Sequence, residues 1–132
     1  MSRAKRSEAR PRELADDALL DLVQRQTFRY FWDFAHPVSG LARERSNVRP
    51  DYGLETVTTG GSGFGVMAIL VAAERGWIGR QEARDRLLRI VRFLLKADSY
   101  HGILPHFLNG ETGGTMPFTR KDDGGDLVET SF

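Results

Sequence analysis

The segment from Ser62 to Arg75 places the strongest constraint on the fold, because it predicts a helix that is apolar on nearly every side. Glycine and alanine occupy most of the positions between its large apolar residues, and Gly76 supplies a helix stop. Such a helix is stable in water only when other elements cover it. The sequence therefore predicts a layered, all-α structure with this helix on the inside.

Two amphipathic helices are predicted on either side of it. Near-helical spacing of apolar residues from Glu13 to about Ala35 predicts a long first helix with an aromatic end. From about Arg80 to Ala97, an apolar stripe lies opposite a charged face, which is typical of an outer helix. The aromatic residues of the first helix could stack on sugar rings, but packing in the core is their more common role. They are Tyr30, Phe31 and Trp32.

The connections between these helices are very unequal in length. A short turn at 76–79 follows the second helix, whereas residues 36–61 and 98–124 form long irregular stretches. Each long stretch ends in a Gly-Gly step into a helix, at Gly61 and at Gly125, which indicates a repeated order of outer helix, long loop, inner helix and short turn. This alternation places both long loops at one end, where loops and helix N-termini favour a site for a polar ligand. A small hairpin is predicted in the second loop, with 106–108 and 116–118 around a turn at 109–110.

The richest group of carboxylates lies at that second Gly-Gly step. If a helix begins near Gly125, Asp126 and Glu129 share one face, and Asp122 and Asp123 lie in the approach to its positive end. Carboxyl groups at such a mouth suit general acid and base chemistry on a glycosidic bond, and neighbouring negative charges raise one another's pKa. The alternative is structural: Asp122 or Asp123 caps the helix and Asp126 favours its first turn.

The first long loop carries a second polar group. Its arginines either hydrogen-bond the hydroxyl groups of a ligand or hold the loop through ion pairs, and the two interpretations stay open. Its other polar residues are candidates for ligand binding. The group consists of Arg43, Glu44, Arg45, Asp51, Tyr52 and Glu55.

Composition excludes several other functions. With 19 Lys and Arg against 18 Asp and Glu, the net charge is +1, which disfavours nucleic acid and other large polyanions as partners. The chain has no cysteine, so thiolate metal sites and cysteine nucleophiles are excluded. The three histidines lack metal-ligand spacing, and neither an EF-hand nor a phosphate-binding loop is present, so no metal and no cofactor is predicted. No stretch is long enough to span a membrane.

Residues 1–12 are predicted to be a disordered basic tail. They contain five basic residues without the apolar run of a secretory signal, which leaves cytoplasmic, periplasmic and secreted locations open for the complete protein. A nucleic-acid anchor is the less favoured alternative, because the tail has no aromatic residue to stack on a base.

Three stretches, at 30–46, 59–65 and 123–132, resemble the start of the glucoamylase-like proteins. This group of glycoside hydrolases includes the endo-β-1,2-glucanases and domains associated with cyclic β-1,2-glucan synthesis. The resemblance extends in matching order from about Leu14 to Phe132. It implies an (α/α)6 barrel that hydrolyses a β-linked glucan, most favourably β-1,2-glucan, by an inverting route without a cofactor.

By position, the resemblance implies that Asp122, Asp126 and Glu129 lie in the substrate cleft as acid, base or sugar-holding groups, in roles that it does not assign. Arg43, Arg45, Asp51, Tyr52 and Asp123 are the predicted substrate-binding residues. A twelve-helix barrel needs a longer chain, so residues 13–132 are expected to be a truncated, N-terminal part of one. The alternative function is a non-catalytic helical carbohydrate-binding module or an inactive remnant of a disrupted gene. The oligomeric state stays open.

Overall fold

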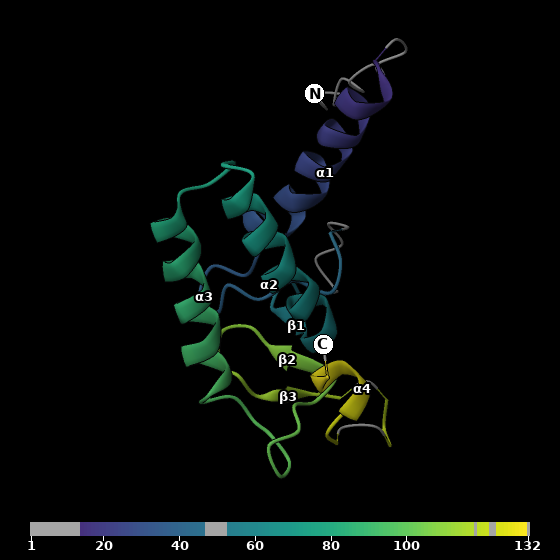
Figure 1. The fold of residues 1–132 in the computed structure, drawn as a ribbon. Coiled ribbons are helices and arrows are strands. Elements are labelled where there is room, and N and C mark those ends of the chain that lie inside the picture. Colours follow the sequence, from purple (N-terminus) through teal and green to yellow (C-terminus); the bar gives the residue numbers. More distant parts are fainter. Residues whose placement is uncertain (1–13, 47–52, 118, 122–123, 132) are drawn as a thin grey trace, which may run out of the picture.

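The computed structural model describes residues 14–46, 53–117, 119–121 and 124–131, and these form four helices and a small sheet (Figure 1). The helices are α1 (Asp16–Trp32), α2 (Thr59–Glu74), α3 (Arg80–Leu94) and the short α4 (Leu127–Thr130). The strands are β1 (Thr56–Thr58), β2 (Phe107–Asn109) and β3 (Thr115–Met116). The three predicted helices and the start of a fourth are therefore confirmed, and the sheet is built from the two long loops.

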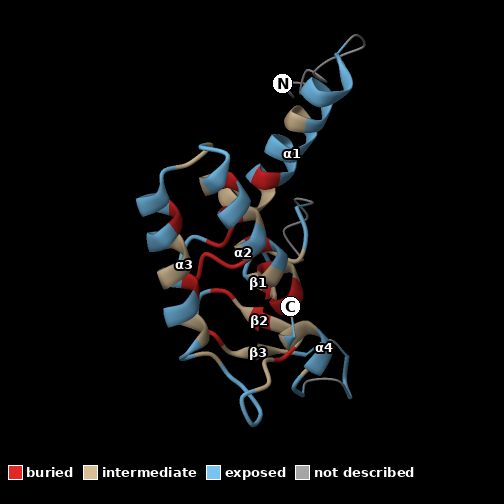
Figure 2. Cartoon of the chain, in the orientation of Figure 1, coloured by how far each residue is buried: buried red, intermediate tan, exposed pale blue. Residues whose placement is uncertain are grey.

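Helix α2 lies at the centre of this arrangement. Helices α1 and α3 both pack against α2, and its N-terminal end contacts β1 and α4. Figure 2 shows the buried residues where these elements face one another. The core cluster consists of Phe28, Leu41, Val57, Ile69, Ala72, Ala83, Ile90 and Leu108.

The end of α2 follows from its sequence. Gly76 adopts φ +69°, a conformation in which a side chain would be strained. The N–H of Trp77 then donates to the carbonyl of Ala72 at 2.8 Å, and the N–H of Gly76 donates to Ala73 at 3.2 Å. This Schellman arrangement satisfies carbonyl groups that the helix leaves free at its C-terminus. Trp77 turns back onto the core, where its ring lies 5.9 Å from that of Phe28.

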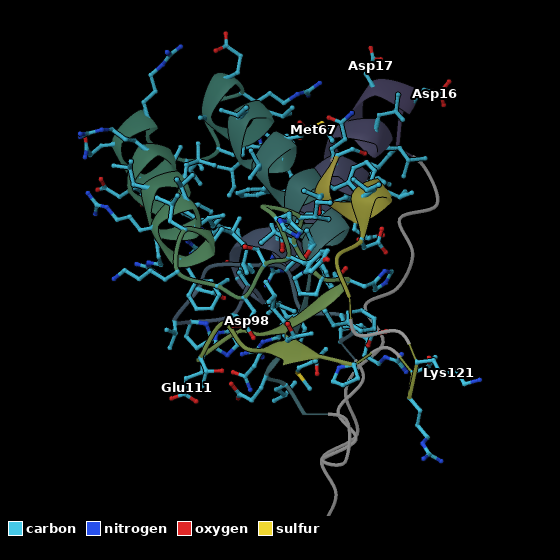
Figure 3. All side chains as sticks on the ribbon, turned by 90° about the horizontal axis from the view of Figure 1, so that it is seen from below. Asp16, Asp17, Met67, Asp98, Glu111 and Lys121 are labelled. Carbon is cyan, nitrogen blue, oxygen red and sulfur yellow. The ribbon has the colours of Figure 1, made fainter. Side chains whose placement is uncertain are left out.

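One side of α2 is covered and the other faces outward. Ile69 is 1% exposed in the core, whereas its neighbour Leu70 is 54% exposed. Phe64 and Met67 belong to the same outward face, and Figure 3 labels Met67. Within the part of the chain that the structure describes, the packing elements are too few to cover a helix that is apolar all round.

The two long loops meet at one end of the molecule, as the alternation of helices predicted. Strand β1 of the first loop pairs antiparallel with β2 of the second, and β2 pairs with β3. The second pairing confirms a hairpin in the second loop, although its first strand begins at Phe107 and its turn is longer than predicted. The sequence did not predict β1, because only three residues form it and its partner lies far along the chain.

None of the helices within the described ranges is long and apolar enough to cross a membrane.

Candidate active site

The segment 104–106 connects the N-terminal end of α2 to α4. The N–H of Thr59 donates to the carbonyl of His106 at 3.1 Å, and its hydroxyl donates to the carbonyl of Pro105 at 2.6 Å. On the other side, the N–H of Asp126 donates to the carbonyl of Leu104 at 2.8 Å. These backbone contacts bring the end of the first long loop, the second loop and α4 to one place. The convergence predicted from the sequence therefore exists.

Asp126 is the N-cap of α4 rather than a residue within the helix. Its Oδ1 accepts the N–H of Glu129 at 3.0 Å, and its Oδ2 lies 2.9 Å from Nδ1 of His106. The backbone hydrogen bond from Glu129 lowers the pKa of Asp126 most, and the hydrogen bond from His106 lowers it further. Because an ionised carboxylate only accepts hydrogen bonds, the proton between this pair lies on Nδ1 of His106.

Glu129 contacts the first turn of α2. Its Oε2 accepts the N–H of Gly60 at 2.6 Å and lies 3.4 Å from the hydroxyl of Thr58. Helix α2 has no acidic residue in its own first turn, so Glu129 supplies the negative charge that a helix N-terminus favours. A Cβ atom on Gly60 would overlap the carboxylate of Glu129. The first Gly-Gly step therefore permits this contact.

Both carboxylates lie near one nitrogen atom of His106. Its Nδ1 lies 2.9 Å from Oδ2 of Asp126 and 3.9 Å from Oε1 of Glu129. All three side chains are partly exposed, with His106 at 32%, Asp126 at 31% and Glu129 at 21%. From the sequence, the histidines were candidates only for metal binding, so a role for His106 beside the carboxylates was not predicted. Its contact with a carboxylate twenty residues away has no local sequence pattern that could have shown it.

The sequence-predicted residues divide into three groups by position. The structure brings Asp126 and Glu129 together at His106. Arg43 and Arg45 lie on the segment that precedes β1, far from that cluster in the sequence. Arg43 forms an isolated antiparallel β-bridge with Val57. The predictions for Asp51, Tyr52, Asp122 and Asp123 lie outside the described residues.

The two arginines have different surroundings. The guanidinium of Arg43 lies 4.9 Å from the ring centroid of Phe34, and within the described part of the chain its buried Nε has no hydrogen-bond partner. Arg45 forms an ion pair with its neighbour Glu44. Glu55, from the same loop, accepts from Nε2 of the buried His36 at 2.8 Å, because Nδ1 of His36 accepts the N–H of Val38 at 3.3 Å.

Among the described residues, no group of three or more His, Asp and Glu side chains is arranged to hold a metal ion. An ionised Asp126 can activate water or accept the hydroxyl groups of a sugar. It is a poor proton donor, because the same hydrogen bonds stabilise its charged form.

Comparison with known proteins identifies relatives of this chain. An exo-β-1,2-glucooligosaccharide sophorohydrolase from Parabacteroides distasonis is 52% identical over 120 residues. The solved structure of an endo-β-1,2-glucanase from Chitinophaga pinensis, in complex with sophorotriose and glucose, is 56% identical and matches with a TM-score of 0.87. This chain is a homologue of the β-1,2-glucanases. The resemblance inferred from the three sequence stretches is confirmed.

The match covers most of this chain and a minor part of each relative. It includes 90% of the chain, but 16% of the Parabacteroides sophorohydrolase and 29% of the Chitinophaga glucanase. The structure of a β-1,2-glucanase from Parabacteroides distasonis gives the same picture, with a TM-score of 0.82, 51% identity and 17% of its chain covered. The helical fold is thus that of part of a glucoamylase-like (α/α)6 barrel. No protein-family model matches the chain.

Proposed function

We propose that this chain is part of a glycoside hydrolase that acts on β-1,2-linked glucan by acid and base hydrolysis. The observation that carries the proposal is the pair Asp126 and Glu129, which α4 presents beside His106 in a chain homologous to proteins named as β-1,2-glucan hydrolases. Asp122 belongs to the same proposed acidic set by its place in the sequence. The substrate is a glucan oligosaccharide or polysaccharide, and no cofactor is required.

The positions of the two carboxylates favour different tasks for them. Asp126 and Glu129 both lie within 4 Å of the same nitrogen of His106, so the two carboxylates are close neighbours. An inverting hydrolase needs room for a sugar and a water molecule between its acid and its base, whose carboxyl groups are about 6.5–9.5 Å apart. Asp126 and Glu129 therefore act on the same side of the substrate. Asp126 is the ionised group that accepts from water or a sugar hydroxyl, and Glu129 holds α4 to α2.

The proton donor then comes from another carboxyl group. Asp122 is one candidate by sequence, and the part of the relatives that this chain does not span is the other source. We propose an inverting outcome, in which Asp126 activates water as the base and a separate acid protonates the leaving oxygen from the opposite side of the scissile bond. Proton magnetic resonance of the first product formed distinguishes the two outcomes: an α-anomer indicates inversion and a β-anomer indicates retention.

The test uses this chain and a chimaera in which it replaces the matching segment of the Chitinophaga glucanase. Both are incubated with linear β-1,2-glucan and, in parallel, with β-1,3- and β-1,4-glucans, and new reducing ends are measured. We expect the chimaera to cleave the β-1,2-glucan and Asp126→Asn to lower the rate at least about a hundredfold. Asp85→Asn on the outer helix α3 is the matched control and leaves the rate unchanged.

A folded chimaera that cleaves none of the glucans contradicts the proposal, and so does full activity in Asp126→Asn. A second candidate function is a non-catalytic carbohydrate-binding module. It is favoured by the observation that both carboxylates already accept hydrogen bonds from backbone N–H groups, which is a structural role. Binding of sophorotriose by this chain without hydrolysis by the folded chimaera would select that alternative.

A further inference from the structure

The small sheet has two chemically different faces. Residues paired directly across antiparallel strands point to the same face, so Val57 and Leu108 share one side. Both are fully buried in the core. By the same register, Thr58, Phe107 and Met116 lie in a row across the opposite side, and each is only partly buried. The second face is therefore turned away from the core.

A pocket opens over this second face. Thr56, Phe107 and Met116 line one part of it, and Glu44 and Arg45 line another, with a cavity volume of about 300 Å³. The segment carrying Glu44 is fixed to the sheet, because the N–H of Glu44 donates to the carbonyl of Thr56 at 3.0 Å. The pocket thus lies between a strand surface and a loop segment that is hydrogen-bonded to that surface.

The row of side chains continues from the pocket to the carboxylates. Thr58 is the register partner of Phe107, and its hydroxyl lies 3.4 Å from Oε2 of Glu129. On the next strand, the ring of Phe107 lies 4.4 Å, centroid to centroid, from the ring of His106, which holds Asp126. The pocket and the carboxylate cluster are therefore neighbours along one surface.

The lining indicates the class of ligand. A flat aromatic ring and a thioether suit the apolar face of a pyranose ring, and an adjacent carboxylate and guanidinium suit its hydroxyl groups. Glu44 neutralises Arg45 through their ion pair, which favours an uncharged ligand over a phosphate. A volume of about 300 Å³ lies at the low end for small-molecule sites and fits one sugar ring.

We propose that this pocket is a subsite that binds one glucose unit of the glucan, while an adjacent unit lies at the carboxylates. The inference rests on the proposed function and adds to it a specific place and a ring-binding residue. Phe107 contacts the face of the sugar, and Glu44 and Arg45 contact its edge. Because the pocket lies next to His106, a chain of at least two glucose units occupies both the pocket and the carboxylate cluster. The affinity is therefore expected to rise from glucose to sophorotriose.

The experiment is a titration of this chain with glucose and with sophorotriose, followed through backbone amide NMR shifts. In the wild type, the amides of Thr56, Phe107 and Met116 are expected to shift with sophorotriose. Phe107→Leu keeps an apolar strand residue but removes the flat ring, and is expected to weaken sophorotriose binding roughly three- to tenfold. Phe64→Leu makes the same chemical change on the exposed face of α2, outside the pocket lining, and is the matched control.

The outcomes separate this inference from the proposed function. Sophorotriose binding that is unchanged in Phe107→Leu, or shifts confined to residues outside the pocket, overturns the subsite and leaves the function standing. Equal weakening in Phe107→Leu and Phe64→Leu also overturns it, because the effect then comes from the fold. A wild-type chain that binds neither sugar overturns the subsite, whereas the proposed function is decided separately by cleavage of β-1,2-glucan in the chimaera. The shifts of the wild type decide the question even if Phe107→Leu fails to fold.

Discussion

Gly60→Ala is predicted to destabilise the protein, although alanine is the better helix former. Gly60 is the second residue of α2, where replacing glycine by alanine ordinarily stabilises a helix by up to about 1 kcal/mol. Here the new Cβ would occupy the position of the Glu129 carboxylate. Glu129 must then leave the N–H of Gly60, which it accepts at 2.6 Å. A hydrogen bond to a charged group contributes about 1.5–3 kcal/mol, so the net effect is a loss of roughly 0.5–2 kcal/mol.

The assay is thermal and urea unfolding of four proteins that form a double-mutant cycle. For a domain of this size, the predicted loss lowers the midpoint temperature by about 2–8 °C. In the Glu129→Ala background the overlap is gone, so Gly60→Ala becomes neutral or stabilising, and the coupling between the two sites exceeds about 1 kcal/mol. Gly124→Ala is the control, because among the described residues other than its chain neighbours no heavy atom would lie within 4 Å of a Cβ there.

Two results would refute this reasoning. Stabilisation of the otherwise wild-type protein by Gly60→Ala would mean that Glu129 is not held at the start of α2. An equal effect of Gly60→Ala with and without Glu129 would mean that the two residues do not interact. Either result would also remove the structural task proposed for Glu129.

Three further predictions concern other parts of the molecule. The lowered pKa of Asp126 contributes stability that is present above the pKa of about 4 of an unfolded aspartate and is lost as the pH falls through the folded pKa. Asp126→Asn should therefore reduce the decrease in unfolding midpoint temperature between pH 5 and about 2. An unchanged acid dependence would contradict this. Gly110→Ala should cost about 1–3 kcal/mol in urea unfolding, because its Cβ would lie 2.6 Å from Cγ of the buried His36, and a neutral effect would argue against this contact. Ile69→Ala should lower the free energy of unfolding by about 2–4 kcal/mol, whereas Leu70→Gln on the exposed face should change it by less than about 0.5 kcal/mol. Leu70→Gln should also raise solubility, measured by concentration-dependent light scattering. Similar losses of stability at both sites would contradict the outward orientation of Leu70.

The site was only partly predictable from the sequence, and the reason is the range of its contacts. Local spacing indicated that Asp126 and Glu129 lie near a helix start, and the structure confirms a helix at Leu127. Their hydrogen-bond partners, Gly60 and His106, belong to distant segments. No periodicity within a helix reports such pairs. The predictions for Asp51, Tyr52, Asp122 and Asp123 lie outside the described residues and stay predictions.

The sequence by itself determined the local elements and the kinship of this protein. Apolar spacing located α1, α2 and α3, and Gly76 ended α2, because helix periodicity and a positive φ are properties of neighbouring residues. Only the tertiary structure decided which sides of α2 are covered, that β1 joins β2, and that Glu129 reaches the first turn of another helix. These features depend on contacts between segments far apart in the chain, whose geometry is set when the two long loops pack at one end.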